Sequence, residues 1–344
     1  MSAARPAAEG AREKTSRFAL FSAVVGAISG AAFALAPVLP FAQIDLIEKL
    51  LVLGPLVGIP LGLSLASHGT LGSGDQRALA ALVRLQPVLA LTVVASVLAP
   101  RGATALSVTA PWLLFCGAVS LLGGYRAIQR FRAAKSLRDP RFAIDAALMY
   151  LAVGGAWHAL ARGGMRPLGF DDAIVRLTAV HFHFAGWVAP LFAARVAIAL
   201  ESPNASDRAR RVASIVLGIV VLGPGLVGGG ITVSQVTSTR VVELVTAVIL
   251  AAALLVLGGL TVSAARREVR SSAARGLLNA SSTTLALTMA LAVAYAWSRV
   301  THGSWPTIPF MARYHGVFNA VGYALFGLAG WAVEDATSTR NQEA

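Results

Sequence analysis

The sequence predicts an all-α fold, a polytopic bundle of transmembrane helices, on two observations. The first is composition: 56% of the 344 residues are hydrophobic, only 13% are charged, and the mean hydropathy is +0.69. Soluble domains average about 25% charged residues, so this chain has too little charge to cover its surface in water. The second is that apolar stretches long enough to cross a bilayer recur along the whole chain.

A helix crosses the hydrocarbon core with about 20 apolar residues, and we expect about ten such spans. Their approximate ranges are 18–39, 47–67, 79–99, 104–125, 142–162, 173–199, 212–233, 241–264, 277–298 and 315–334. Pro55 and Pro60 should kink the second span. Charged residues around Glu48 leave the first residue of this span undefined. The first span is longer than a signal sequence core and lacks a convincing cleavage site, so we interpret it as a retained helix.

The charge of the connections predicts the orientation. Three connections are strongly basic, with Arg126, Arg130, Arg132, Lys135, Arg138 and Arg141; Arg208, Arg210 and Arg211; and Arg266, Arg267, Arg270 and Arg275. The alternate connections are nearly bare, one with Arg101 alone and another with Arg240 alone. The positive-inside rule places the basic connections and both termini in the cytoplasm. We therefore expect a cytoplasmic tail at 1–16, one transmembrane domain at 17–335, and a second cytoplasmic tail at 336–344.

Several function classes are excluded by the same pattern. The formal net charge of +13 could indicate nucleic acid binding, but the arginines lie between apolar spans, where topology explains them. Motifs of soluble nucleotide-binding proteins and serine hydrolases do not occur. The single cysteine, Cys116, permits no internal disulfide. We expect a multi-pass protein of the bacterial plasma membrane, with the bilayer and a lipophilic or small-molecule substrate as partners; the oligomeric state stays open.

Polar residues gather on the expected outer side. The fifth span ends with His158 and Arg162, the next connection contains Asp172, and the sixth span carries His181 and His183. Residues two apart on a helix differ by about 200° in direction, so these two histidines should face different surroundings. The tenth span begins with His315 and Asn319, which are four apart and share a face.

This grouping suggests a site in the outer leaflet. The expected catalytic residues are His183, His181, His315 and Asp172, and the expected binding residues are Arg162, Arg176, His158 and Asn319. Each histidine has an alternative interpretation as a structural hydrogen bond between helices, and Asp172 as a helix cap. No metal ligand set is expected, and the cofactor stays open.

Two segments, "WHALARGGMRPLGFDDAIVRLTAVHFHFAGW" and "HGVFNAVGYALFGLAGW", resemble the YndJ-like family of bacterial integral membrane proteins. The matching residues of the first segment are Arg162, Gly164, Pro167, Gly169, Phe170, Leu177, Thr178, Ala179, His181, Phe182, His183, Ala185 and Gly186. Those of the second are His315, Gly316, Asn319, Ala320 and Gly322. Trp187 stands where the family pattern has another aromatic residue such as Phe. The resemblance implies a polytopic fold with the histidines as its signature, and it implies no particular activity.

Three functions compete. The favoured one is a membrane-embedded acid/base enzyme of isomerase, hydrolase or cyclase type, because histidine titrates near neutral pH. The alternative is a small-molecule transporter or exporter, for which Glu243 and Asp145 are the candidates for proton coupling. The third is a haem or metal site built from His158, His315 and one of His181 and His183.

Overall fold

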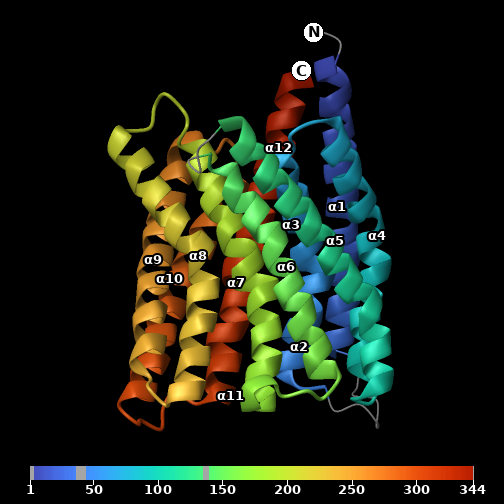
Figure 1. Cartoon of the computed structure of the whole chain (residues 1–344). Helices are drawn as coiled ribbons and strands as arrows, with labels where there is room; N and C mark the ends of the chain where they lie inside the picture. Colours follow the sequence, from blue (N-terminus) through green and yellow to red (C-terminus); the bar gives the residue numbers. More distant parts are fainter. Residues whose placement is uncertain (1–3, 36–43, 135–138, 344) are drawn as a thin grey trace. The chain divides into compact units, whose positions relative to one another are not determined.

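The computed structural model describes residues 4–35, 44–134 and 139–343, and all regular structure in these ranges is helical (Figure 1). The elements are α1 (Ala4–Leu35), α2 (Leu46–Leu53), η1 (Gly54–Gly58), α3 (Ile59–Ala66), η2 (Ser67–Gly69), α4 (Ser73–Leu98), α5 (Ala103–Ala134), α6 (Arg141–Arg162), η3 (Pro167–Gly169), α7 (Asp172–Ala199), α8 (Asp207–Thr237), α9 (Val241–Glu268), α10 (Ser272–Val300), α11 (Ile308–Met311), η4 (Ala312–Gly316), η5 (Phe318–Leu325) and α12 (Phe326–Glu343). The predicted all-α class is confirmed.

Within the described residues, nine helical stretches are long and apolar enough to cross a membrane. They are Leu46–Gly69, Ser73–Leu98, Ala103–Ala134, Arg141–Arg162, Asp172–Ala199, Asp207–Thr237, Val241–Glu268, Ser272–Val300 and Ile308–Ser338. Each overlaps one of the expected spans, from the second to the tenth. α1 covers most of the expected first span, whose last residues, 36–39, lie outside the described residues.

The basic connection expected after the fourth span begins later than predicted. Arg126, Arg130 and Arg132 lie on the last turns of α5, because that helix continues to Ala134. Lys135 and Arg138 lie outside the described residues. The expected cytoplasmic position of both termini stays a prediction.

The chain divides into two compact units, residues 1–191 and 192–344. Helix α7 crosses the boundary and contributes residues to both units. The expectation of one transmembrane domain over 17–335 stays a prediction.

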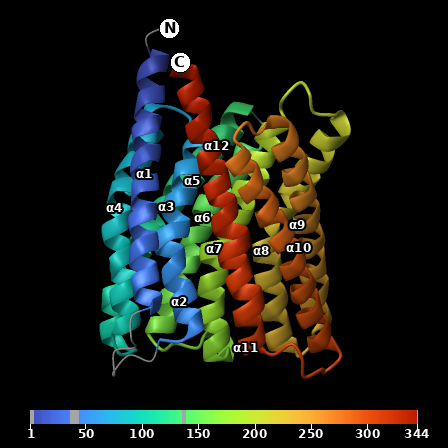
Figure 2. The ribbon, with the colours of Figure 1, turned by 180° about the vertical axis from the view of Figure 1, so that it is seen from behind.

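In the first unit, one span is enclosed by other helices. Of the most apolar part of Leu46–Gly69, 94% is buried. α1, α4 and α6 pack against α3, and α1 and α4 run beside it in both views (Figures 1 and 2). We call Leu46–Gly69 the buried span.

The expected kink of the buried span takes the form of a π-helical segment, η1. Here the N–H of Ile59 donates to the carbonyl of Gly54. The next bond of this pattern would join the N–H of residue 60 to the carbonyl of Pro55, but Pro60 has no N–H. Gln86 on α4 supplies the missing donor: its Nε2 lies 2.6 Å from the Pro55 carbonyl oxygen.

Helix α7 packs closely on the same break because glycines leave room for its large side chains. A Cβ added at Gly62 would lie 2.3 Å from Nε1 of Trp187, and one at Gly54 would lie 3.3 Å from the Cβ of His183. The Trp187 indole donates to the carbonyl of Gly58 at 3.2 Å. Side chains of two neighbouring helices therefore bind the carbonyls at the break.

In the second unit, α8 and α9 are regular helices that pack through small residues. α8, α9 and α10 run beside one another in both views, and α12 packs on α10 (Figures 1 and 2). On α8, a Cβ at Gly223 would lie 2.4 Å from Leu250 and one at Gly230 would lie 2.6 Å from Thr246, both on α9. The segment "GPGLVGGG" (223–230) is therefore a packing face inside an unbroken helix, unlike the similar segment "GPLVGIPLG" (54–62).

Candidate functional site

Charged side chains gather where the buried span begins. Nη1 of Arg162 lies 3.1 Å, and Nη2 of Arg101 lies 3.5 Å, from Oε1 of Glu48. Nη1 of Arg101 also lies 2.6 Å from Oδ1 of Asp172, whose Oδ2 is 2.9 Å from Nε of Arg176. We call these five residues the Glu48 cluster.

Glu48 and Arg162 are the buried members of this cluster, with 5% and 3% of their surface exposed. Arg162 also donates to the carbonyl of Ala99 at 2.6 Å. Glu48 and Asp45 form a capping box, in which each side chain accepts the other's backbone N–H. Glu48 therefore both starts α2 and balances a buried guanidinium.

Arg101 lies in the connection between α4 and α5 and is exposed. Partial burial lowers the pKa of its guanidinium, but the hydrogen bond and charge of Asp172, together with the charge of Glu48, outweigh burial. The net result is a raised pKa, so Arg101 stays a cation and links the exposed and buried acids of the cluster.

His158 lies one turn before Arg162 on α6 and is fully buried. Its Nε2 lies 3.0 Å from Oγ of Ser96, whose hydroxyl donates to the carbonyl of Val93 at 2.8 Å. With the serine proton used there, the tautomer that satisfies both groups has its proton on Nε2, and we assign the lone pair to Nδ1 on this basis. Nδ1 is buried and has no hydrogen-bond partner. This is an acceptor available for acid/base chemistry.

His183 uses both ring nitrogens in structural bonds. Nδ1 donates to the carbonyl of Ala179 at 2.8 Å, and Nε2 accepts the indole N–H of Trp112 at 3.1 Å. Arg176, an expected binding residue of the same helix, bonds Asp172 and Asp45, because these carboxylates lie at its own end of the unit. The sequence could not show this, since Asp45 is distant along the chain.

The other histidine of this helix faces different surroundings, as its spacing predicted. His181 is exposed, and its Nδ1 lies 2.7 Å from the carbonyl of Leu177. His183, in contrast, is fully buried. Of the two, His183 is therefore the one that faces the interior of the first unit.

Two arginines of α5 bind the other end of the buried span. Arg126 is fully buried, and its Nη1 donates to the carbonyl of Ala66 at 3.1 Å. Its Nε lies 2.8 Å from Oδ2 of Asp75. Asp75 also accepts the backbone N–H groups of Leu71 and Gly72, so it caps α4 as well.

Arg130, one turn further on, makes the equivalent contacts. Its Nη2 donates to the carbonyl of Gly69 at 2.7 Å, and its Nε lies 2.9 Å from Oδ2 of Asp145. Its Nη1 lies 3.1 Å from Oδ2 of Asp139. We call Arg126, Arg130, Asp75, Asp139 and Asp145 the Gly69 cluster. Asp145, a proton-coupling candidate of the transporter hypothesis, is thus a fully buried ion-pair partner.

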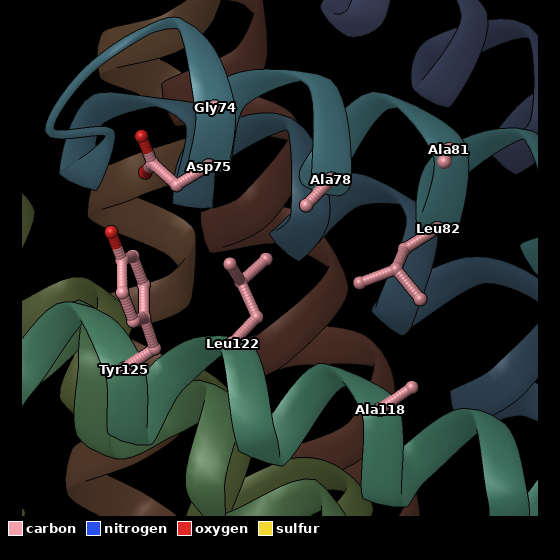
Figure 3. Close-up of a pocket in the computed structure, with 8 residues that line it drawn as sticks. All are labelled: Gly74, Asp75, Ala78, Ala81, Leu82, Ala118, Leu122 and Tyr125. Atoms are coloured by element: carbon pink, nitrogen blue, oxygen red, sulfur yellow. The ribbon is translucent and has the colours of Figure 1, made fainter.

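A groove of about 510 Å³ lies beside this cluster, between α4 and α5 (Figure 3). It is lined by Gly74, Asp75, Ala78, Ala81, Leu82, Ala118, Leu122 and Tyr125. The Asp75 carboxylate and the Tyr125 hydroxyl lie at one end, and alanine and leucine side chains line the rest (Figure 3). None of the predicted site residues lines this groove.

The second unit holds the remaining predicted residues. His315 and Asn319 share a face, as expected, and both bond Thr288 of α10. Nδ1 of His315 donates to the Thr288 carbonyl at 2.9 Å, its Nε2 lies 3.1 Å from Nδ2 of Asn319, and the Thr288 hydroxyl donates to Asn319 at 2.9 Å. Both residues lie on the π-helical segments η4 and η5. A cavity shared with the first unit stays a prediction.

Glu243, the other proton-coupling candidate, also lies in the second unit. It is buried in the first turn of α9. Its carboxylate oxygens lie 3.7 Å from Nη1 of Arg240 and 3.9 Å from Nε of Arg299. At these distances Glu243 forms ion pairs with the two arginines but no close hydrogen bonds.

Sequence reasoning found Arg162, His158 and Asp172 but missed Glu48, which it treated only as blurring the start of a span. The signal was available, because Asp45 followed three residues later by Glu48 is a capping box before an apolar run. It also counted Arg126 and Arg130 as connection charges. Their spacing of four places them on one helix face.

For the haem or metal hypothesis, the described residues contain no group of three His, Cys, Asp or Glu side chains that could hold a metal ion. The histidines named in that hypothesis are divided between the two units.

Fold and clusters define the class: this is a multi-pass α-helical membrane protein with ion-pair clusters at both ends of one buried span. The family described as YndJ-like protein matches residues 49–323. The chain therefore belongs to the YndJ-like family, as its two motif segments indicated.

One curated relative is "Uncharacterized membrane protein YndJ" of Bacillus subtilis (strain 168), with 27% identity over 255 residues. The match covers 74% of this chain and 43% of the relative, so the chain spans less than half the length of that protein. No solved structure matches the chain.

Proposed function

We propose that this protein is a transporter of a small molecule in which the buried span moves between two states. The observation that carries the proposal is the construction of that span: its hydrogen bonding changes from α- to π-helical in the middle, and arginine-containing clusters bind both of its ends. Secondary transporters use interrupted helices near their substrate sites and move one element against another.

The break is suited to act as a hinge. It separates two regular helices, α2 and α3, of eight residues each. The Gln86 bond replaces a backbone hydrogen bond at the break, and the Trp187 bond adds a second side-chain contact there. Side-chain bonds can be exchanged while each half of the helix keeps its own hydrogen bonds. Single-turn π-helical segments are frequent at functional sites.

The two clusters are suited to act as latches for the two halves. Glu48 belongs to α2 and bonds arginines from outside the span, whereas the Gly69 cluster bonds the carbonyls of Ala66 and Gly69, where the span ends. A buried ion pair is either formed or broken, because one partner left alone costs about 3–5 kcal/mol. Release at one end would free that half while the other half stays bound.

Accessibility of introduced cysteines tests the proposal. Cys116 is first replaced by Ala, and a reporter is placed near each cluster: Ser96→Cys beside His158 and Ser67→Cys at the end of the span. Both serines are buried, with 0% and 3% exposed. Labelling by a membrane-impermeant thiol reagent is followed in intact cells and in inverted vesicles.

Two charge-balanced variants release one cluster each: Glu48→Gln with Arg162→Gln, and Asp145→Asn with Arg130→Gln. We expect the first to raise labelling at position 96 from one side, and the second to raise labelling at position 67 from the opposite side. Each rise should be at least tenfold and confined to its own end. No rise at either end, or a rise at both ends from the same side, would rule out alternating access.

A second candidate, the acid/base enzyme acting on a lipophilic substrate, is favoured by His158, whose Nδ1 is a buried acceptor without a partner. His183, His181, His315 and Asp172 remain its other proposed catalytic residues, although His183 and His315 would first have to give up existing bonds. An enzyme needs access from one side only. Labelling restricted to position 96 would favour it over the transporter.

A further inference from the structure

A second buried polar atom without a partner lies next to His158. Arg162 directs its Nη atoms to Glu48 and to backbone carbonyls, but its Nε–H has no hydrogen-bond partner and is buried. The two residues are four apart on α6, so their side chains lie on one face of the helix, about 5–6 Å apart at Cβ. Together they present one donor, Nε–H, and one acceptor, Nδ1.

The pairing of a donor with an acceptor selects the ligand's chemistry. An unpaired buried donor or acceptor costs about 1–3 kcal/mol, so both atoms favour a ligand that satisfies them together. The matching group must accept from Nε–H and donate to Nδ1. Carboxylic acids, alcohols and primary amides all meet this condition.

We propose that His158 and Arg162 bind the carboxyl group of an apolar carboxylic acid, which would be the transported substrate. This rests on the proposed function. Two carboxyl oxygens can bridge groups one helical turn apart more readily than a single hydroxyl oxygen. A guanidinium also strengthens its bond when the acceptor becomes anionic, which a carboxyl group allows and an alcohol or amide does not.

The bound acid can transfer its proton within the site. The O–H bond breaks, the proton moves to the lone pair of His158 Nδ1, and the electron pair stays on the carboxylate beside Arg162. The products are a carboxylate and an imidazolium, and no other reactant is needed.

Binding of decanoic acid to the purified protein in nanodiscs at pH 7 tests the proposal. Titration calorimetry compares decanoic acid with 1-decanol and decanamide, and empty nanodiscs correct for partition into lipid. The variants are His158→Gln, which removes the Nδ1 acceptor, and Arg162→Lys, which keeps the charge facing Glu48 but removes Nε–H. His302→Ala, in an exposed connection, is the matched control.

We expect decanoic acid to bind the wild type and the His302 control equally, and each site variant at least tenfold more weakly. The alcohol and the amide should bind the wild type at least tenfold more weakly than the acid. Equal affinity for the acid and the alcohol, or an undiminished affinity in both site variants, would overturn the proposal. Cysteine labelling distinguishes this proposal from the proposed transport function. Opening at both ends without binding of the acid would reject only the carboxyl site. Binding of the acid without opening would reject only transport.

Discussion

At the residue scale, burial decides which charged contacts matter. Glu48 and Arg162 are almost inaccessible, whereas Asp172 and Arg101 in the same cluster have 29% and 36% of their side chains exposed. Solvent screens exposed pairs, whose contributions are about 0–1 kcal/mol. Loss of one partner from a buried pair costs about 3–5 kcal/mol, because a charge is left without compensation.

Glu48→Ala should therefore lower the free energy of unfolding by about 3–5 kcal/mol, and its lost capping box adds to this. Asp172→Ala, the matched control, should lower it by about 1 kcal/mol or less. Denaturant titration in micelles measures both. Equal losses would show that the buried pair has no special role.

The double variant with both Glu48→Gln and Arg162→Gln should be more stable than Arg162→Gln alone. Removal of both charges leaves no uncompensated ion, so the second substitution offsets part of the first. The same titration gives the coupling between the two positions. Strictly additive losses would contradict a direct interaction.

Residue types could be predicted at this scale, but their partners could not. The sequence pointed to His158, His183 and Arg162 because polar groups in apolar runs are rare. It could not show that Trp112 bonds His183, since the two residues are 71 positions apart. Nor could it show that Nδ1 of His158 lacks a partner, because this depends on how Ser96 is oriented.

At the element scale, the break in the buried span follows from its prolines. The sequence predicted a kink there, since Pro60 removes a backbone donor. It could not predict which neighbour would bond the Pro55 carbonyl, because that depends on how α4 packs. Gln86 is that neighbour, and Ser22 of α1 donates to its Oε1 at 3.1 Å.

Gln86→Leu should destabilise the protein by about 1–3 kcal/mol, because it leaves the Pro55 carbonyl buried without a donor. Pro60→Ala, introduced into the same protein, restores an N–H near that carbonyl and should recover part of the loss. Thermal unfolding of the two single variants and the double variant measures the effect. Ser22→Ala is the control, because it removes a hydrogen bond to Gln86 but leaves the Pro55 carbonyl paired. If the double variant showed no recovery of stability, this explanation of the break would be contradicted.

At the scale of the whole molecule, the spans were predictable and their assembly was not. Nine expected spans correspond to helices because apolar length alone identifies them. The contact between Glu48 and Arg162 joins residues 114 positions apart, and no local pattern encodes it. The division into units at residue 191 also left no signal in composition.

The orientation of the protein in the membrane is predicted from the sequence alone. Reporter fusions at Ala344 and within 135–138 should both report the cytoplasm, because the basic connections stay inside. A fusion within 163–166 should report the opposite side. An external reading at Ala344 would mean that the number of spans differs by one from the ten expected here.

The central claim, that the buried span moves separately at its two ends, is tested most directly by pulsed electron paramagnetic resonance distances. In a Cys116→Ala protein, one spin-label pair at Ile44 and Leu168 reports the end near Glu48, and another at Leu71 and Arg132 reports the end near Gly69. We predict that Glu48→Gln with Arg162→Gln lengthens the first distance and leaves the second unchanged, and that Asp145→Asn with Arg130→Gln does the reverse. If both distances stayed unchanged in both variants, this claim would be contradicted.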